Sequence, residues 1–258
     1  MSSLSEQALP LYQRVHDAVM ARIVSGDLTP GAMLPSEFDL AAQYSVSQGT
    51  ARKALNKLEQ SGLVERHQGK GTFVATTTPE TSLFHFFRLR HQDESQAIPQ
   101  PFSETIRRRA ANAKEAQVLG LEARGAVFEI ARVRCIKKTK VCYETSVLNA
   151  DLFPGLKERS PLPNALYPLY QRSYGVTIVR ADEQLRAIEA TSSIANMLAV
   201  SEGTPVLEVE RRAFDIVGRV VELRFSFYLT SQLHYSVCLL YTSPSPRDIS
   251  GSRMPSSA

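Results

Sequence analysis

The chain has 258 residues, a mass of 28.6 kDa and a formal net charge of +4. With 43% hydrophobic and 22% charged residues, it has the composition of an ordinary globular protein, and its length favours two modest domains over one. No apolar run approaches the roughly 20 residues that span a bilayer, and residues 1–9 lack the pattern of a secretory signal. We therefore expect a cytoplasmic protein without a membrane partner, in which Cys135, Cys142 and Cys238 are free thiols.

The first third of the chain has the pattern of a helix-turn-helix. Apolar spacing and capping residues predict three helices, over residues 10–25, from Ser36 through Tyr44, and from the residue after Ser47 to the stop at Ser61-Gly62. Ser36 as N-cap and Asp39 three residues later form a capping-box pattern. The start of the third helix is rich in small and hydrogen-bonding residues, which suits entry into a DNA major groove.

A short hairpin follows the third helix. Strands at Leu63–Arg66 and Thr72–Val74 flank the sequence Gln68-Gly69-Lys70-Gly71, which we interpret as the tip of a wing. Between residues 47 and 75, five basic residues stand against two acidic ones, although the N-terminal part as a whole is near neutral. A local basic cluster of this kind is what phosphate contacts require, but a solvated charged face would have the same composition.

The remaining sequence predicts an α+β domain with a largely antiparallel sheet. We expect a winged helix-turn-helix over residues 10–75, a linker over 76–82, this second domain over 83–237, and a non-native tail over 238–258, for which a natural disordered tail is the alternative. The clearest strands are Val127–Ile136, Val141–Leu148, Ile178–Ile188, Val206–Phe214 and Val220–Leu229, with helices at Ala113–Leu119, Asn164–Ser173 and Ser192–Leu198.

The second domain contains an internal echo at an offset of 79 residues. Ala116, Leu119, Leu121, Val127, Glu129, Ile130 and Arg132 match Ala195, Leu198, Val200, Val206, Glu208, Val209 and Arg211, with five of the seven pairs identical. Each copy is a short helix that leads into a long strand, and Glu144 and Glu222 occupy similar places in the two returning strands. A duplicated helix and hairpin is one interpretation, and shared strand chemistry is the other.

Two groups of motifs together resemble a known family. Leu34-Pro35-Ser36-Glu37, Thr50-Ala51-Arg52-Lys53-Ala54-Leu55 and Gln68-Gly69-Lys70-Gly71-Thr72 resemble the GntR family of bacterial transcription factors, over essentially all of residues 10–75. Glu129-Ile130-Ala131-Arg132, Leu152-Phe153-Pro154-Gly155 and Val220-Val221-Glu222 resemble the UTRA effector-sensing domain of its HutC-type subfamily, which has a chorismate-lyase-like fold.

The resemblance implies a homodimer that binds a palindromic, double-stranded DNA operator. It implies DNA contact by Ser36, Ser47, Gln48, Gly49, Thr50, Arg52, Lys53, His67, Gln68, Gly69 and Lys70. Two residues depart from the family pattern. Gln48 replaces a common arginine, and glutamine pairs with adenine where arginine prefers guanine. Phe38 replaces a polar residue that some relatives use on DNA. For Arg52, Lys53 and the wing glycines, the alternative is an ordinary surface or hairpin role.

In the second domain, Arg132 and Arg134 lie two apart on a strand and therefore share one face. Paired arginines suit a bidentate grip on carboxylate or phosphate. The resemblance implies that a small-molecule effector binds at Arg132, Arg134, Glu144, Glu222 and Tyr228. Structural salt bridges within the sheet are the alternative interpretation of the same residues.

These patterns favour a ligand-responsive repressor that an anionic or sugar-phosphate-like metabolite releases from DNA. A constitutive DNA-binding protein without an effector is the first alternative, and a chorismate-lyase-like enzyme is the second. The sequence supplies no nucleophile–base pair, metal cluster or phosphate loop, and its five histidines are scattered. We therefore expect no catalytic residues, no metal and no cofactor.

Overall fold

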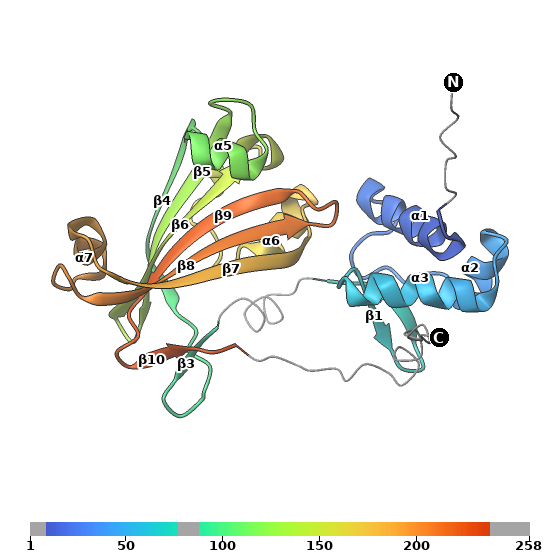
Figure 1. Cartoon of the computed structure of the whole chain (residues 1–258), viewed down its shortest axis with the longest axis horizontal. Coiled ribbons are helices and arrows are strands. Elements are labelled where there is room, and N and C mark those ends of the chain that lie inside the picture. Colours follow the sequence, from blue (N-terminus) through green and yellow to red (C-terminus); the bar gives the residue numbers. More distant parts are fainter. Residues whose placement is uncertain (1–8, 77–87, 238–258) are drawn as a thin grey trace, which may run out of the picture.

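The structure is a computed structural model that describes residues 9–76 and 88–237 (Figure 1). The predicted linker at 76–82, beyond its first residue, and the predicted tail at 238–258 lie outside these residues. The first described segment is an N-terminal head with the helices and strands α1 (Leu11–Ser25), α2 (Glu37–Gln43), α3 (Gln48–Gln60), β1 (Val64–His67) and β2 (Gly71–Val74). The two strands pair antiparallel, so the predicted winged helix-turn-helix is confirmed.

One apolar cluster holds the head together. Val19 of α1, Leu40 of α2 and Leu55 of α3 are all buried and pack into the same core, together with Val64 of the wing. The predicted capping box fixes the start of α2, because the Ser36 hydroxyl accepts from the Asp39 amide while the Asp39 carboxylate accepts from the Ser36 amide. The helix α3 buries Ala51, Ala54, Leu55 and Leu58 in this core and leaves Arg52 and Lys53 exposed.

The second domain is built on a six-stranded antiparallel sheet with strand order β4-β5-β6-β9-β8-β7. The strands are β4 (Gln100–Ala110), β5 (Ala126–Ile136), β6 (Thr139–Asn149), β7 (Ile178–Glu189), β8 (Pro205–Asp215) and β9 (Val220–Tyr228). The helices are α5 (Ala113–Leu119), α6 (Tyr167–Tyr174) and α7 (Ser192–Leu198), with short 3₁₀ turns η1 (Ala150–Leu152) and η2 (Lys157–Arg159). The predicted antiparallel α+β domain is confirmed.

The sheet order shows that the internal echo is structural. The first half, β4-α5-β5-β6, and the second half, β7-α7-β8-β9, fill equivalent places, and the two halves meet where β6 pairs with β9. Equivalent residues also pair across equivalent strands. Glu104 lies opposite Arg132, and 79 residues later Glu183 lies opposite Arg211. Shared strand chemistry alone would not reproduce this topology.

Helices cover the two faces of the sheet differently (Figure 1). On one face, α6 and the 3₁₀ turns pack against Phe128 and Leu148. On the other face, α5 packs against Val127 and Leu223, and α7 packs against Val206. The face under α6 is the one on which the predicted effector residues lie.

Sequence analysis did not anticipate three strands. The edge strand β4 has no apolar alternation, and the ribbon of β3 (Leu89–His91) and β10 (Leu233–Tyr235) is too short for a periodic signal. An edge strand with one neighbour buries few side chains, so it carries charged residues, which also discourage pairing with other chains. The ribbon connects to the edge of the sheet, because the Tyr235 hydroxyl donates to Glu183 of β7 at 2.7 Å.

Candidate DNA interface and ligand site

The start of α3 is capped from within. The Ser47 hydroxyl accepts from the Thr50 amide at 3.2 Å, and its oxygen lies 2.8 Å from the Thr50 hydroxyl oxygen. This N-cap satisfies an amide that would otherwise lack a partner and leaves Gln48 and Gly49 exposed at the positive end of the helix. At the helix start, Ser47 and Thr50 therefore form the cap, and Gln48 and Gly49 face solvent.

Arg52 lies one turn further along α3 with its side chain 59% exposed. Its Nε donates to Glu37 Oε2 of α2 at 2.9 Å, and Arg66 of the wing lies 3.6 Å from the other carboxylate oxygen of Glu37. One carboxylate therefore connects α2, α3 and the wing. Sequence analysis missed Glu37, because residues 15 positions apart in sequence give no local signal of this contact.

Lys53 points toward α1 instead. Its ammonium lies 4.2 Å from the centre of the Tyr12 ring, which attracts it through a cation–π interaction. The residue stays exposed. The side chain of Lys53 thus contacts α1, whereas that of Arg52 contacts α2.

The wing tip presents its predicted residues to solvent. Gln68, Gly69 and Lys70 are exposed, and Gly69 has a φ of +72°, a left-handed conformation that glycine adopts without strain. His67 lies just before the tip, with its ring edge-on to Phe73 at a centroid distance of 5.2 Å. The hairpin therefore presents an exposed lysine at its tip.

The strand register brings all five predicted effector residues onto one face of the sheet. In the strand register, Arg132 of β5 lies opposite Glu144 of β6. Cys142 of β6 lies between Arg134 on β5 and Tyr228 on β9. Glu222 is on the same face of β9, six residues before Tyr228 and opposite Leu148 of β6. Four of the five are buried, and Tyr228 is partly exposed.

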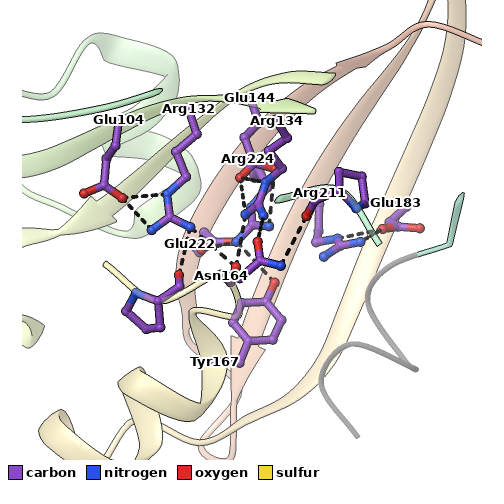
Figure 2. Close-up of polar contacts among 12 residues, drawn as sticks. Glu104, Arg132, Arg134, Glu144, Asn164, Tyr167, Glu183, Arg211, Glu222 and Arg224 are labelled. Carbon is purple, nitrogen blue, oxygen red and sulfur yellow. Dashed lines mark hydrogen bonds and ion pairs between the residues drawn. The ribbon is translucent and has the colours of Figure 1, made fainter. Parts of the chain in front are cut away.

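The two arginines of β5 are held by carboxylates and by the loop before α6 (Figure 2). Arg132 contacts Glu104 at 2.6 Å and donates to the Pro163 carbonyl at 3.1 Å. Arg134 contacts Glu144 at 2.7 Å and also donates to the side chain and the carbonyl of Asn164. Both guanidinium groups therefore have partners within the protein.

Glu222 is the centre of the second half of this network (Figure 2). It is fully buried and accepts from the hydroxyls of Tyr167 and Tyr170 on α6 at 3.1 and 2.8 Å. Arg224 contacts the same carboxylate at 2.9 Å. Burial and the neighbouring Glu222 charge raise the pKa of Tyr167 to about 12, so its hydroxyl remains a donor.

The buried arginines on this face are paired with carboxylates. Four arginines each have a carboxylate partner, in the pairs Arg132–Glu104, Arg134–Glu144, Arg211–Glu183 and Arg224–Glu222. Sequence analysis missed Glu104, Glu183, Arg211 and Arg224 as members of this network. The offset of 79 residues could have found the first three, because it relates one Arg–Glu pair to another.

The electrostatic environment keeps Glu144 ionised. Burial alone would raise its pKa, but the charges of Arg134 and Arg224 outweigh this effect and lower the pKa to about 2. Tyr228 has the opposite balance, because burial, Cys142 and Glu144 all raise the pKa of its hydroxyl. A ligand that reaches this face would therefore meet fixed guanidinium and carboxylate charges and neutral phenols.

We searched the described residues for metal-binding clusters and for membrane-spanning helices. These residues contain no group of three or more potential metal ligands. In the same part of the chain, no helix has the length and apolar character needed to cross a membrane. Cys135 and Cys142 are free thiols, and Cys238 lies outside the described residues.

A winged head with a locally basic third helix and wing, joined to a sheet domain with a buried polar face, defines a DNA-binding regulator with a separate sensing domain. The sequence profile of the bacterial regulatory proteins of the gntR family matches residues 11–74, and that of the UTRA domain matches residues 104–234. The chain belongs to the GntR family, in the branch that carries a UTRA domain, as the HutC-type resemblance implies. It is a transcriptional repressor of this type and not an enzyme.

Similar proteins span nearly the whole chain. The HTH-type transcriptional repressor NagR of Bacillus subtilis is 29% identical over 230 residues, which are 88% of this chain and 94% of NagR. The histidine utilization repressor of Pseudomonas aeruginosa is 28% identical over 226 residues, 85% of this chain and 86% of that protein. The solved ligand-binding domain of a GntR-family regulator from Bordetella bronchiseptica is 33% identical, with a TM-score of 0.54, and the match covers 60% of this chain and 98% of that domain.

Proposed function

We propose that the chain is a cytoplasmic, homodimeric repressor that binds a palindromic operator and is released by a small anionic metabolite. The observation that carries this proposal is the division of charge between the two domains. The head exposes Arg52 and the wing lysine Lys70, while the sheet domain buries four arginines on one face. DNA and a small effector therefore have separate candidate surfaces.

The DNA surface consists of the start of α3 and the wing. We propose that Gln48 and Gly49 enter the major groove, that Arg52 contacts a base or phosphate, and that Lys70 contacts the backbone. Ser47 and Thr50 support the helix start, as does Ser36 at α2. Lys53, His67, Gln68 and Gly69 complete the proposed interface. The exposed face is basic, so the backbone contacts will make affinity salt-dependent.

The effector surface is the face under α6. An anionic group that binds Arg134 must compete with Glu144, which already contacts the guanidinium at 2.7 Å. Ligand binding would therefore rearrange the network of Arg132, Glu222 and Tyr228 around it. We propose that this rearrangement favours an arrangement of the two heads that does not fit the operator. A coupling of about 1–3 kcal/mol would change operator affinity roughly 5–150-fold.

A second candidate is a repressor that binds DNA constitutively. The observation in its favour is that each of the four buried arginines on the proposed effector face already has a carboxylate partner. A face of this kind can serve stability and orientation alone. The two candidates differ in one measurable property, which is whether any metabolite stabilises the folded chain.

The test begins with thermal unfolding of the full chain against a panel of sugar phosphates, carboxylates and phosphonates. A ligand that binds only the folded state raises the unfolding temperature. The proposal predicts a ligand that does so and also weakens operator binding. Stable protein that binds its operator tightly, with no stabilising ligand in a broad panel, would favour the constitutive candidate.

Two variants separate the proposed surfaces. We expect Arg52→Ala to lose operator binding and to keep ligand stabilisation. The double variant Arg134→Met/Glu144→Leu removes a buried ion pair as a unit, so it keeps most of the folding stability. We expect it to bind the operator and to lose the ligand response. Loss of both responses in each variant would contradict the proposed division of labour.

A further inference from the structure

Phe38 has an unusual position for an apolar residue. It lies in the first turn of α2 with 73% of its surface exposed, the highest value among the large apolar side chains of the described residues. The helix buries Leu40 into the head core, so Phe38 is not needed for packing there. An isolated exposed apolar side chain is common on protein surfaces, so its surroundings decide whether it has a role.

The surroundings of Phe38 are those of the proposed DNA surface. Its neighbour Glu37 contacts Arg52 of α3 at 2.9 Å and Arg66 of the wing at 3.6 Å. These two contacts fix the first turn of α2 between the exposed side of the recognition helix and the wing. A duplex that met Arg52 and the wing together would therefore approach the same turn.

The major groove offers one apolar feature, the C5-methyl group of thymine, and phenylalanine is among the side chains that contact it. Resting on the DNA-binding function proposed above, we propose that Phe38 packs against a thymine methyl group in each operator half-site. Phe38 is then a specificity-determining residue. It selects an A·T pair without a hydrogen bond, whereas Arg52 and the helix start contact hydrogen-bonding groups of the DNA.

Deoxyuridine provides a direct probe, because it differs from thymidine by this methyl group alone. The operator is selected with the wild-type chain, and each thymine is then replaced by uracil in both half-sites. Removing one buried methyl group costs about fourfold in affinity per half-site. We expect one symmetric thymine position to show this loss with the wild-type chain.

The variant Phe38→Ala tests the residue itself. It should bind the thymine and uracil operators with equal affinity, close to that of the wild-type chain on the uracil operator. Met33→Ala is the matched control, because Met33 is a second exposed apolar residue of the head, with 62% of its surface exposed. Met33→Ala should keep the wild-type preference for thymine. Thermal unfolding of both variants checks that the head remains folded.

Three results would overturn the inference. Equal affinity of the wild-type chain for every uracil-substituted operator would show that no thymine methyl group is read. A thymine preference that persists in Phe38→Ala would assign the methyl group to another residue. A Phe38→Ala variant with altered mass in solution and equal losses on both operators would place Phe38 between two copies of the chain. In all three cases an operator is still bound, whereas failure to select any operator would contradict the proposed function itself.

Discussion

Several charged side chains of this protein are buried in the sheet domain, where an unpaired charge would cost stability. Glu144 and Arg134 are almost completely buried and lie 2.7 Å apart, and the charges of Arg134 and Arg224 keep the pKa of Glu144 low despite its burial. Removing one partner of a buried pair leaves an uncompensated charge, which costs far more than the pair itself contributes. Removing the charge of a single side chain in this network should therefore lower the free energy of unfolding of the sheet domain strongly.

The first prediction concerns Glu144→Gln. We expect a loss of about 3–5 kcal/mol in the free energy of unfolding, because Arg134 loses its charged partner. Glu208→Gln is the control, since its partner Arg186 is 55% exposed and surface pairs contribute about 0–1 kcal/mol. Chemical denaturation at neutral pH measures both values. Equal losses in the two variants would contradict the assigned role of burial.

The same residue predicts a dependence on pH. Folding lowers the pKa of Glu144 from 4.5 to about 2, so its contribution to stability is fully present above pH 4.5. This contribution is lost as the pH falls toward 2, because the unfolded chain then binds a proton that the folded chain excludes. The stability difference between the wild type and Glu144→Gln should shrink over that range. A constant difference would contradict the low pKa.

In the head, Glu37 contacts both Arg52 and Arg66, so its charge can be tested for an effect on DNA binding. A carboxylate near DNA repels phosphates, so Glu37→Gln should raise the affinity for non-specific DNA. The same change frees Arg52 from its 2.9 Å contact, so the ratio of operator to non-specific affinity should fall. Glu59→Gln is the control, because Glu59 contacts Arg66 and not Arg52. It should raise non-specific binding and leave the ratio closer to that of the wild type.

At the scale of elements, the proposed DNA surface divides its contacts between the wing and α3. If Lys70 contacts one phosphate, Lys70→Ala should reduce the slope of log affinity against log salt by about 1 per chain. Lys138→Ala removes an exposed lysine from a turn of the sheet domain and should leave the slope unchanged. Titrations at several salt concentrations measure the slope, and an equal slope for Lys70→Ala and the wild type would remove the wing from the interface.

The elements also show what could be predicted from sequence. The helices of the head and the central strands were predictable, because apolar residues such as Leu55 in α3 and Val127 in β5 belong to runs whose spacing is typical of a helix or a buried strand. The edge strand β4 was not, because it has no apolar alternation, whereas β7 at the opposite edge was predicted over Ile178–Ile188. Glu104 and Asn164 gave no local signal as partners of Arg132 and Arg134, because they reach the arginines through tertiary contacts, and only the 79-residue offset points to Glu104.

At the scale of the whole molecule, a contact between the domains offers a route for coupling. Val179 of β7 and Ile216, in the turn between β8 and β9, pack against the core of the head. Glu222 and Arg224 of the buried network lie on β9, directly after this turn. A rearrangement of the network can therefore shift the surface on which the head rests.

Ile216→Ser tests this route. The change weakens an apolar contact between domains and leaves both proposed binding surfaces intact. We expect ligand stabilisation and operator affinity to change little, while the factor by which the ligand weakens operator binding falls toward one. Val217→Ser is the control, because Val217 is in the same turn and 47% exposed. An unchanged factor in Ile216→Ser would exclude this contact as the route.

The most direct measurement is selection of bound duplexes from a random pool by the full chain. A dimeric repressor predicts enrichment of an inverted repeat, bound by two chains, with the enrichment lost in Arg52→Ala. Failure to enrich any sequence above the input pool would contradict specific DNA binding. Enrichment of a single motif without a repeat would contradict the symmetric dimer.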